Sequence, residues 1–197
     1  MSLEIYIGPM YAGKTTKLIQ KYMDEPDLNK VIIDYNIQTQ KSEVEENYVF
    51  HSCMQTHDGI IAPNVYKCKK LTGLNDKENY QMFSKDSLEY YYSVYANSRH
   101  VFINECQFFP DLKQFVLSLL RFGIHVYLFG LDGDFKQQLM GQTMDLLPYS
   151  SKIEKLRGKC SKCKNFAIIS HRITKDKQVY LPDENAYIPL CLTCYNY

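Results

Sequence analysis

The fold of this chain follows from eight residues, GPMYAGKT at 8–15, which fit the pattern G-x4-G-K-[S/T]. The preceding segment, LEIYIG at 3–8, is an apolar run that predicts a buried strand. The following segment, 14–25, repeats its apolar residues at helical spacing. A glycine loop between a strand and a helix is the context in which this pattern binds phosphate groups. Backbone N–H groups of the loop and of the helix N-terminus then point at the anion.

The residue types of this loop suit a nucleoside triphosphate. Gly8 and Gly13 allow close approach of the backbone, Lys14 can reach the β- and γ-phosphates, and Thr15 can ligate Mg²⁺. The alternative is a glycine turn before a helix with an incidental lysine. The agreement of pattern and context favours the phosphate-binding loop.

The same alternation of short apolar strands and helices continues along the chain. Strands are predicted at 31–34, 100–104 and the start of 125–135, and helices at 84–98 and 111–123. Residues 36–84 are polar and interrupted, and their pattern allows one further short strand. This order predicts an α/β fold with a parallel sheet covered by helices on both faces.

A glutamate follows the predicted strand at 100–104, in the stretch FINECQFFP at 102–110. Ligands of open α/β sheets bind beyond the carboxyl ends of the strands, and we expect this strand to neighbour the strand before the glycine loop. There, Glu105 can take the proton of an acceptor hydroxyl. The alternative is a solvated glutamate after a strand, and the phosphate-binding loop argues against it.

Four cysteines form a second strong pattern. Cys160, Cys163, Cys191 and Cys194 are arranged as C-x2-C, 27 residues and C-x2-C. Two such pairs supply the four thiolates of a tetrahedral zinc site, and a closed four-thiolate site is structural. We therefore expect two domains, a nucleotide-binding domain at 1–155 and a zinc-binding domain at 156–197.

Composition limits the remaining possibilities. The chain has 197 residues, a hydrophobic fraction of 45% and a net charge of +1, so no global field favours nucleic acid or membrane. No apolar run is long enough to span a bilayer, and the first residues lack the pattern of a secretory signal. We expect a cytoplasmic protein that binds neither nucleic acid nor membrane.

Four segments occur in a fixed order: GPMYAGKTT, ECQFFPD, GLDGDF and the tail CSKC…YIPLCLTCY. Together they closely resemble the type II thymidine kinases, the cytosolic and viral kind whose substrate is covered by a zinc-anchored lasso. The resemblance implies transfer of the ATP γ-phosphoryl group to the 5′-hydroxyl of thymidine or deoxyuridine. It also implies a homotetramer that dTTP inhibits by feedback.

The resemblance assigns roles to residues at matching positions. Glu105 would be the general base, assisted by Lys14, with Thr15 on Mg²⁺. ATP would contact Gly8, Pro9, Met10, Tyr11, Ala12, Gly13, Lys14, Thr15, Thr16, Gln38, Gln40, Asn104 and Gln107. The thymine pocket and the lasso would comprise Met10, Phe108, Leu131, Phe135, Met140, Ser170, Gln178, Val179, Tyr180, Leu181, Pro182 and Tyr187.

Three segments of the chain depart from the family pattern. Asn104 stands where the family usually has an aspartate that holds the Mg²⁺ shell. Gln38 and Gln40 stand where it has aspartate and arginine, and Pro182-Asp183 replaces a Gly-Gly pair. Loss of charged contacts weakens a site, because charge-assisted hydrogen bonds are roughly twice as strong as neutral ones. A nucleotide-binding or regulatory subunit with weakened catalysis is therefore the alternative function. A nucleic-acid-directed ATPase is disfavoured by the near-neutral charge.

Overall fold

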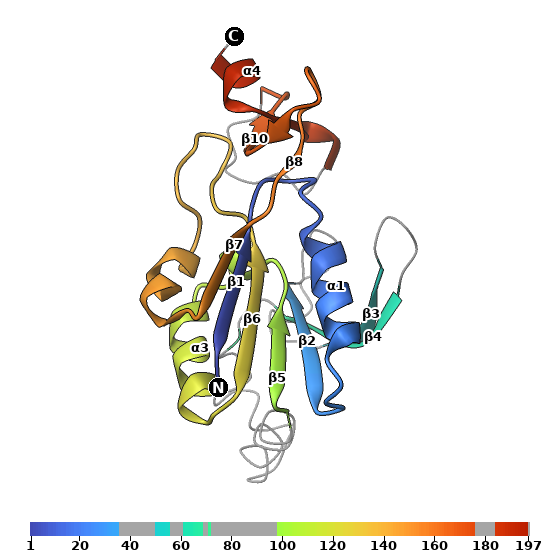
Figure 1. The fold of residues 1–197 in the computed structure, drawn as a ribbon, viewed down its shortest axis with the longest axis vertical. Coiled ribbons are helices and arrows are strands. Elements are labelled where there is room, and N and C mark those ends of the chain that lie inside the picture. The colour runs from blue at the N-terminus through green and yellow to red at the C-terminus, as the bar shows by residue number, and fades with distance from the viewer. Residues whose placement is uncertain (36–49, 56–60, 69–70, 72–97, 176–183, 197) are drawn as a thin grey trace, which may run out of the picture.

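The computed structural model describes residues 1–35, 50–55, 61–68, 71, 98–175 and 184–196. Its centre is a seven-stranded sheet in the order β3-β4-β2-β5-β6-β1-β7, which Figure 1 shows with the helices beside it. The strands are β1 (Leu3–Ile7), β2 (Lys30–Tyr35), β3 (Phe50–Gln55), β4 (Ile61–Cys68), β5 (His100–Ile103), β6 (His125–Gly130) and β7 (Lys152–Lys155). Six are parallel, and β3 pairs antiparallel with β4. The predicted parallel α/β sheet is confirmed.

One face of the sheet packs against helix α1 (Lys14–Asp24). Every second strand residue points to this face, because side chains alternate along a strand. Leu18 and Ile19 of the helix join a buried cluster with Ile32 and Phe102 of the strands. The helical spacing seen in the sequence thus marks the core-facing stripe of α1.

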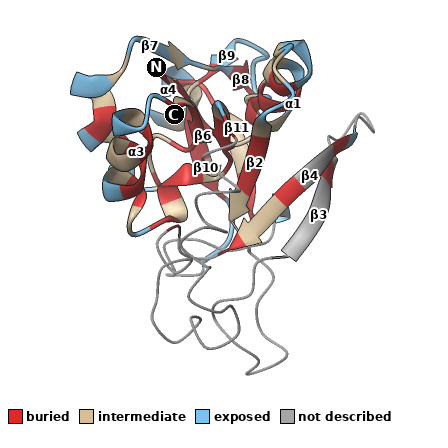
Figure 2. Cartoon of the chain, turned by 90° about the horizontal axis from the view of Figure 1, so that it is seen from below, coloured by how far each residue is buried: buried red, intermediate tan, exposed pale blue. Residues whose placement is uncertain are grey.

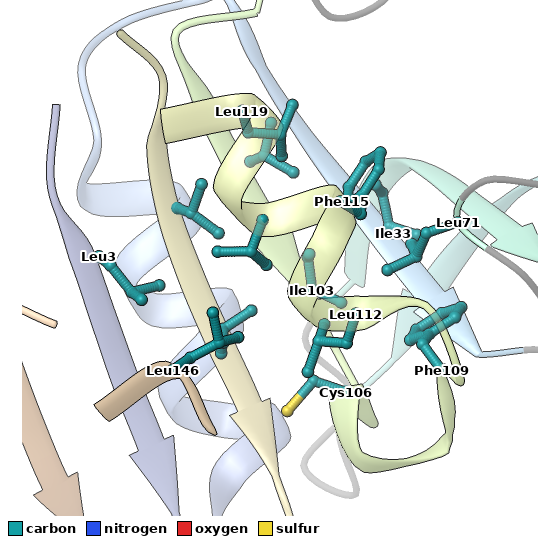
Figure 3. Packing of buried hydrophobic residues seen from close by; sticks show 14 of the residues in the cluster. Leu3, Ile33, Leu71, Ile103, Cys106, Phe109, Leu112, Phe115, Leu119 and Leu146 are labelled. Carbon is teal, nitrogen blue, oxygen red and sulfur yellow. The ribbon is translucent and has the colours of Figure 1, made fainter. Parts of the chain in front are cut away.

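The other face packs against helix α3 (Leu112–Arg121). Phe115 and Leu119 of the helix meet Leu3, Ile33 and Ile103 in a second buried cluster, drawn in Figure 3. The helix ends before Gly123, whose φ of 79° suits a residue without a side chain. Helices therefore cover both faces of the sheet, as predicted. Figure 2 shows the buried residues gathered on the strands between them.

The order of strands corrects one expectation. The strand that ends before Glu105 was expected to neighbour the strand of the glycine loop, but β6 lies between β5 and β1. Both β5 and β1 pair in parallel with β6, so their carboxyl ends still lie at the same edge of the sheet. The site residues therefore reach one another across the end of β6.

Two further strands differ from the sequence-based expectation. β7 was not predicted, because its residues KIEK are charged and mostly exposed, as suits an edge strand. The stretch 36–84 allowed one strand, and its described residues contain two, β3 and β4. The helix predicted at 84–98 lies outside the described residues except for Ser98.

Beyond β7 the chain forms what we call the C-terminal unit, the described residues from 156 onward. It holds two small antiparallel sheets, β8 (Gly158–Lys159) with β9 (Phe166–Ala167) and β10 (Ile169–Arg172) with β11 (Tyr187–Leu190). Figure 1 shows this unit at the top, past the carboxyl end of β1. Short helices complete the described chain: η3 (Cys106–Phe108), η4 (Thr143–Tyr149), η5 (Glu184–Ala186) and α4 (Leu192–Asn196). None of the described helices is long and apolar enough to cross a membrane.

Candidate active site

The glycine loop joins β1 to α1 in a conformation that requires its two glycines. A Cβ atom on Gly8 would lie 2.4 Å from the carbonyl oxygen of Leu156, so this position has no room for a side chain. Gly13 has φ of 76° and caps α1, and its carbonyl accepts a hydrogen bond from the Lys17 N–H at 2.9 Å. Left-handed backbone is the conformation that glycine adopts without strain. The loop therefore presents its backbone directly to the space at the start of α1.

Lys14 begins α1 and is 9% exposed. Its Nζ donates to the carbonyl oxygens of Pro9 at 2.8 Å and Gly8 at 3.3 Å. Burial lowers the pKa of Lys14, and the negative charges of Glu105 and Asp132 oppose this shift. The ammonium group thus lies within the loop and in the field of two carboxylates. Thr15 is half-buried beside it, and Thr16 is exposed.

Glu105 follows β5 and has a left-handed backbone, with φ of 49°. Such a conformation is uncommon for a residue with a side chain and is found disproportionately at functional sites. The Nε2 of Gln107 donates to Oε2 of Glu105 at 2.6 Å, and the Oε1 of Gln107 accepts from the N–H of Leu131 at 2.9 Å. Gln107 therefore ties the glutamate to the carboxyl end of β6.

Two glycines make room for Gln107. A Cβ on Gly130 would lie 2.4 Å from Oε1 of Gln107 and 2.6 Å from Sγ of Cys106. A Cβ on Gly141 would lie 2.2 Å from the Gln107 carbonyl oxygen. Gln107 was predicted to contact ATP, whereas its side-chain hydrogen bonds to Glu105 and Leu131 join the glutamate to β6, and the residue is only 4% exposed. Its contact with ATP stays a prediction.

Asn104, at the tip of β5, contacts an acid that sequence reasoning missed. Its Nδ2 donates to Oδ1 of Asp34 at 2.8 Å, and Lys67 Nζ lies 3.9 Å from Oδ2 of the same carboxylate. Burial raises the pKa of Asp34, and the hydrogen bond from Asn104 and the charge of Lys67 oppose the rise. The signal was present in the sequence, because Asp34 ends the predicted strand at 31–34 just as Asn104 ends the one at 100–104.

Some of the residues expected around the nucleoside join the C-terminal unit to the rest of the protein. The N–H of Met10 donates to Oγ of Ser170 at 2.9 Å, which links the glycine loop to β10. The guanidinium of Arg172 lies 3.8 Å from the ring centroid of Phe135 and 5.0 Å from that of Tyr187, and it donates to the Tyr187 hydroxyl. Arg172 was not predicted, because a lone arginine in a short strand carries no pattern.

The other predicted site residues are placed as follows. Leu131 is buried and bonded to Gln107 through its N–H, Phe108 packs its ring 5.2 Å from that of Tyr35, and Met140 is half-buried. Pro9 is buried, Ala12 is half-buried and Tyr11 is exposed with φ of 61°. Gln38, Gln40, Gln178, Val179, Tyr180, Leu181 and Pro182 lie outside the described residues.

A salt bridge connects β7 to the turn after β6, near the glycine loop. Lys155 Nζ lies 2.7 Å from Oδ2 of Asp132, which joins the last residue of β7 to the turn after β6. The N–H of Leu156 donates to the carbonyl of Ile7 at 2.7 Å. These contacts hold the start of the C-terminal unit against the loop.

The four cysteines predicted to bind metal meet in the C-terminal unit. Their Sγ atoms all lie within 4.8 Å of one another, and those of Cys163 and Cys191 are 3.6 Å apart. A tetrahedral zinc with Zn–S bonds of about 2.3 Å needs sulfurs about 3.8 Å apart. The cluster therefore fits a Zn²⁺ ion.

The acidity of these thiols agrees with a shared site. Burial acts to raise the pKa of Cys160, but hydrogen bonds from the backbone N–H groups of Cys191, Cys163 and Lys162 lower it to about 6. Hydrogen bonds with the thiols of Cys163 and Cys191 raise the pKa of Cys194 to about 12. Zinc, when bound, would hold all four as thiolates.

A glycine loop between the first strand and the first helix, with a buried lysine at its end and a parallel sheet behind it, defines a P-loop α/β protein. Comparison with known proteins identifies the family, because the family model described as "Thymidine kinase" matches residues 1–195. The chain therefore belongs to the thymidine kinase family, whose members are nucleoside kinases. The resemblance drawn from its four motifs is confirmed.

Individual relatives agree over almost the whole chain. The thymidine kinase of Choristoneura biennis entomopoxvirus is 32% identical over 202 residues, which cover 100% of this chain and 97% of that protein. Thymidine kinase 1 of Dictyostelium discoideum is 31% identical over 197 residues, covering 98% of this chain and 77% of that protein. The thymidine kinase of Oryza sativa subsp. japonica is 29% identical over 191 residues, which cover 96% of this chain and 64% of that protein.

Proposed function

We propose that the protein phosphorylates thymidine or deoxyuridine, with ATP as the phosphoryl donor. The 5′-oxygen of the nucleoside attacks the γ-phosphorus, the bond from that phosphorus to the β–γ bridging oxygen breaks, and ADP leaves. The proton of the 5′-hydroxyl passes to the carboxylate of Glu105. The observation that carries this proposal is the tie between Glu105 and Gln107, which holds a carboxylate at the sheet edge shared with the P-loop.

Lys14 would bind the β- and γ-phosphates by exchanging its contacts with the Pro9 and Gly8 carbonyls for phosphate oxygens. This exchange is favourable because a hydrogen bond to an anion is stronger than one to a neutral carbonyl. Thr15 is the residue that the resemblance assigns to Mg²⁺, and Asn104 stands at the position where the family's aspartate holds the Mg²⁺ shell. When bound, this ion neutralises charge that develops on the phosphate oxygens.

The nucleoside would lie between the main sheet and the C-terminal unit. Met10, Phe108, Leu131, Phe135, Met140, Ser170 and Tyr187 would surround the base, and the backbone at 178–182 would cover it. The contacts between Met10 and Ser170 and between Arg172 and Phe135 support this arrangement, because they bring residues of both parts together. Zinc would hold the covering part in shape through the four cysteines.

Further parts of the proposal rest on the family. They are a homotetramer, feedback inhibition by dTTP, a cytoplasmic location and the division into domains at 1–155 and 156–197. The end of β7 at Lys155 supports the division. The cysteines whose side chains are described are all free, which suits a reducing compartment.

The test is incubation of the purified chain with Mg·ATP and each natural nucleoside, followed by detection of the 5′-monophosphate. We expect thymidine monophosphate from the wild type and a loss of at least about 10²-fold in turnover for Glu105→Gln, with ATP binding retained. Glu154→Gln is the matched control, because this half-buried glutamate pairs with Lys152 at 3.2 Å on β7. Normal turnover in Glu105→Gln would remove this residue as the base.

Absence of product with every nucleoside has a different meaning. If the folded, zinc-loaded protein binds ATP and phosphorylates nothing, the alternative function of a nucleotide-binding or regulatory subunit is favoured. The replacement of the expected aspartate by Asn104 is the feature that would then explain the loss.

A further inference from the structure

The tip of β5 carries a buried amide where the family pattern has an acid. Asn104 is 6% exposed, and its Nδ2 donates to Oδ1 of Asp34 at 2.8 Å. β2 and β5 pair in register up to Ile33 and Ile103, and the N–H of Asn104 donates to the carbonyl of Ile33 at 2.8 Å. Asp34 and Asn104 are thus the next opposed positions beyond the last pair of the ladder.

Both side chains lie on the face of the sheet that carries α1. Side chains alternate along a strand, so Asp34 shares a face with Ile32 and Asn104 shares a face with Phe102. Ile32 and Phe102 belong to the buried cluster that packs against α1. The P-loop ends at the start of α1, so the Asp34–Asn104 pair lies on the phosphate side of the sheet.

The chemistry of the pair fixes the orientation of the amide. An ionised carboxylate only accepts hydrogen bonds, so Asn104 must turn its Nδ2 toward β2. With Nδ2 bonded to Asp34, Oδ1 is the amide atom left for another group, and β6 and then β1 with the P-loop lie on the side of β5 away from β2. An amide oxygen is a suitable ligand for Mg²⁺ or for a water of its shell, whereas an amide NH₂ is not.

We infer that Asp34 is the positioning residue of the magnesium site in this protein: it holds Asn104 with Oδ1 facing the Mg·ATP phosphates. It also supplies, one hydrogen bond away, the negative charge that the family pattern carries on an aspartate at position 104. The negative charge is thus on β2, at Asp34, and not at the tip of β5. This inference rests on the proposed function, because it concerns the same ATP site.

The surroundings of Asp34 favour a functional reason for its charge. The Asp34 side chain is only 13% exposed, and the negative charge of Glu105 adds to the cost of ionising it. Lys67 compensates weakly, because its Nζ is 3.9 Å away and its side chain is one-third exposed. An asparagine at position 34 would also accept the hydrogen bond from Asn104 without a buried charge, so the fold alone does not require the carboxylate.

The test measures ATP affinity by calorimetry with MgCl₂ and with EDTA, in the absence of nucleoside. The ratio of the two affinities reports the magnesium contribution. For Asp34→Asn we expect this ratio to fall by about 10- to 100-fold, as for other groups that orient metal ligands. The physical reason is that an amide at position 34 can donate as well as accept, so it no longer selects one orientation of Asn104, whose NH₂ can then turn toward the ion. The affinity with EDTA should stay within about twofold.

Two further variants, Asn104→Asp alone and in combination with Asp34→Asn, complete a double-mutant cycle. Asn104→Asp alone should lower the unfolding temperature, because it places two carboxylates at hydrogen-bond distance. Combined with Asp34→Asn, it exchanges acid and amide between the strands, and we expect the magnesium contribution to return to the wild-type value or higher. An unchanged ratio in Asp34→Asn, or no recovery in the folded double variant, would overturn the inference. An unchanged unfolding temperature in Asn104→Asp would do the same.

Controls separate this result from folding and from the proposed function. Lys67→Met removes the weak ion pair, and Asp145→Asn alters an exposed acid on η4. Neither should change the magnesium contribution, and a loss in Lys67→Met equal to that in Asp34→Asn would count against the role of Asn104. Product formation is measured separately. A wild type that binds Mg·ATP without making product refutes the proposed function alone, and a wild type that binds no ATP refutes both.

Discussion

At the scale of single residues, Lys14 combines a functional position with a cost to folding. Burial lowers its pKa, so the folded protein binds this proton more weakly than the unfolded chain does. The cost is therefore present in full at pH values below the lowered pKa. It is relieved as the pH rises toward the ordinary pKa of a lysine. A residue retained at such a cost is expected to serve function rather than stability.

We expect Lys14→Met to reduce phosphoryl transfer by about 10²- to 10³-fold, because it removes a cation from the charge that develops in the transition state. The ligand-free variant should be at least as resistant to urea at neutral pH as the wild type, because a buried charge is removed. Urea unfolding and turnover are the two measurements. Lys113→Met, which changes a lysine 44% exposed in its side chain, should alter neither. A large loss of stability in Lys14→Met would contradict this account.

At the scale of elements, the turn from β5 through η3 positions Glu105. The backbone of this turn is left-handed at Glu105, and Gln107 bridges from that glutamate to the residue after β6. The absence of a Cβ at Gly130 is what allows the amide of Gln107 to approach the strand. The position of the proposed base is therefore set by packing between two strands and not by β5 alone.

Gly130→Ala tests this packing. The added Cβ would overlap Oε1 of Gln107 and Sγ of Cys106, and overpacking of this kind costs about 1–3 kcal/mol. Displacement of Gln107 should also lower turnover more than nucleoside affinity, because Glu105 loses its hydrogen bond. Urea unfolding and steady-state kinetics are the measurements.

Gly123→Ala is the control for the change of residue type. A Cβ added at Gly123 would have no atom within 4 Å, but this residue adopts φ of 79°. The substitution should therefore cost only a backbone penalty of about 1–2 kcal/mol. Turnover per folded molecule should stay normal. Normal turnover in Gly130→Ala as well would refute the role of Gln107.

At the scale of the whole molecule, we expect the C-terminal unit to depend on its four-cysteine metal site for stability. Two of the four residues in its buried cluster of Cys160, Ala167, Leu190 and Cys191 are proposed zinc ligands. It contacts the main sheet through the Met10–Ser170 hydrogen bond and through Arg172 on Phe135. Loss of the metal should therefore release the residues proposed to surround the nucleoside.

We expect chelation of zinc to weaken thymidine binding by at least about tenfold while ATP affinity changes by less, because the P-loop belongs to the main sheet. Calorimetry with each ligand, alongside metal analysis, gives the comparison. Thiol titration adds a readout of the cluster: among the other cysteines whose side chains the structure describes, burial raises the pKa of both Cys68 and Cys106 to about 12, which disfavours their thiolates. Equal weakening of both ligands would mean that zinc supports the entire fold.

The sequence alone determined the features that depend on local spacing. The P-loop, the helices α1 and α3, the buried strands β1, β2, β5 and β6, and the four cysteines were predicted, because periodicity and ligand spacing are local features of short stretches of chain. Glu105 was singled out for the same reason, as an acid directly after a buried strand. The exposed strand β7 was missed, because its charged residues pair with β1 through backbone groups and leave no apolar pattern.

Only the tertiary structure decided which distant residues meet. It inserted β6 between β1 and β5, placed Arg172 between Phe135 and Tyr187, and joined Asp34 to Asn104 across 70 positions of sequence. Strand order and side-chain contacts of this kind result from how two helices and a sheet bury their apolar faces together, which no short stretch of sequence specifies. The residues of the candidate site were therefore proposed from the sequence, whereas contacts such as those of Asp34 and Arg172 came from the tertiary structure alone.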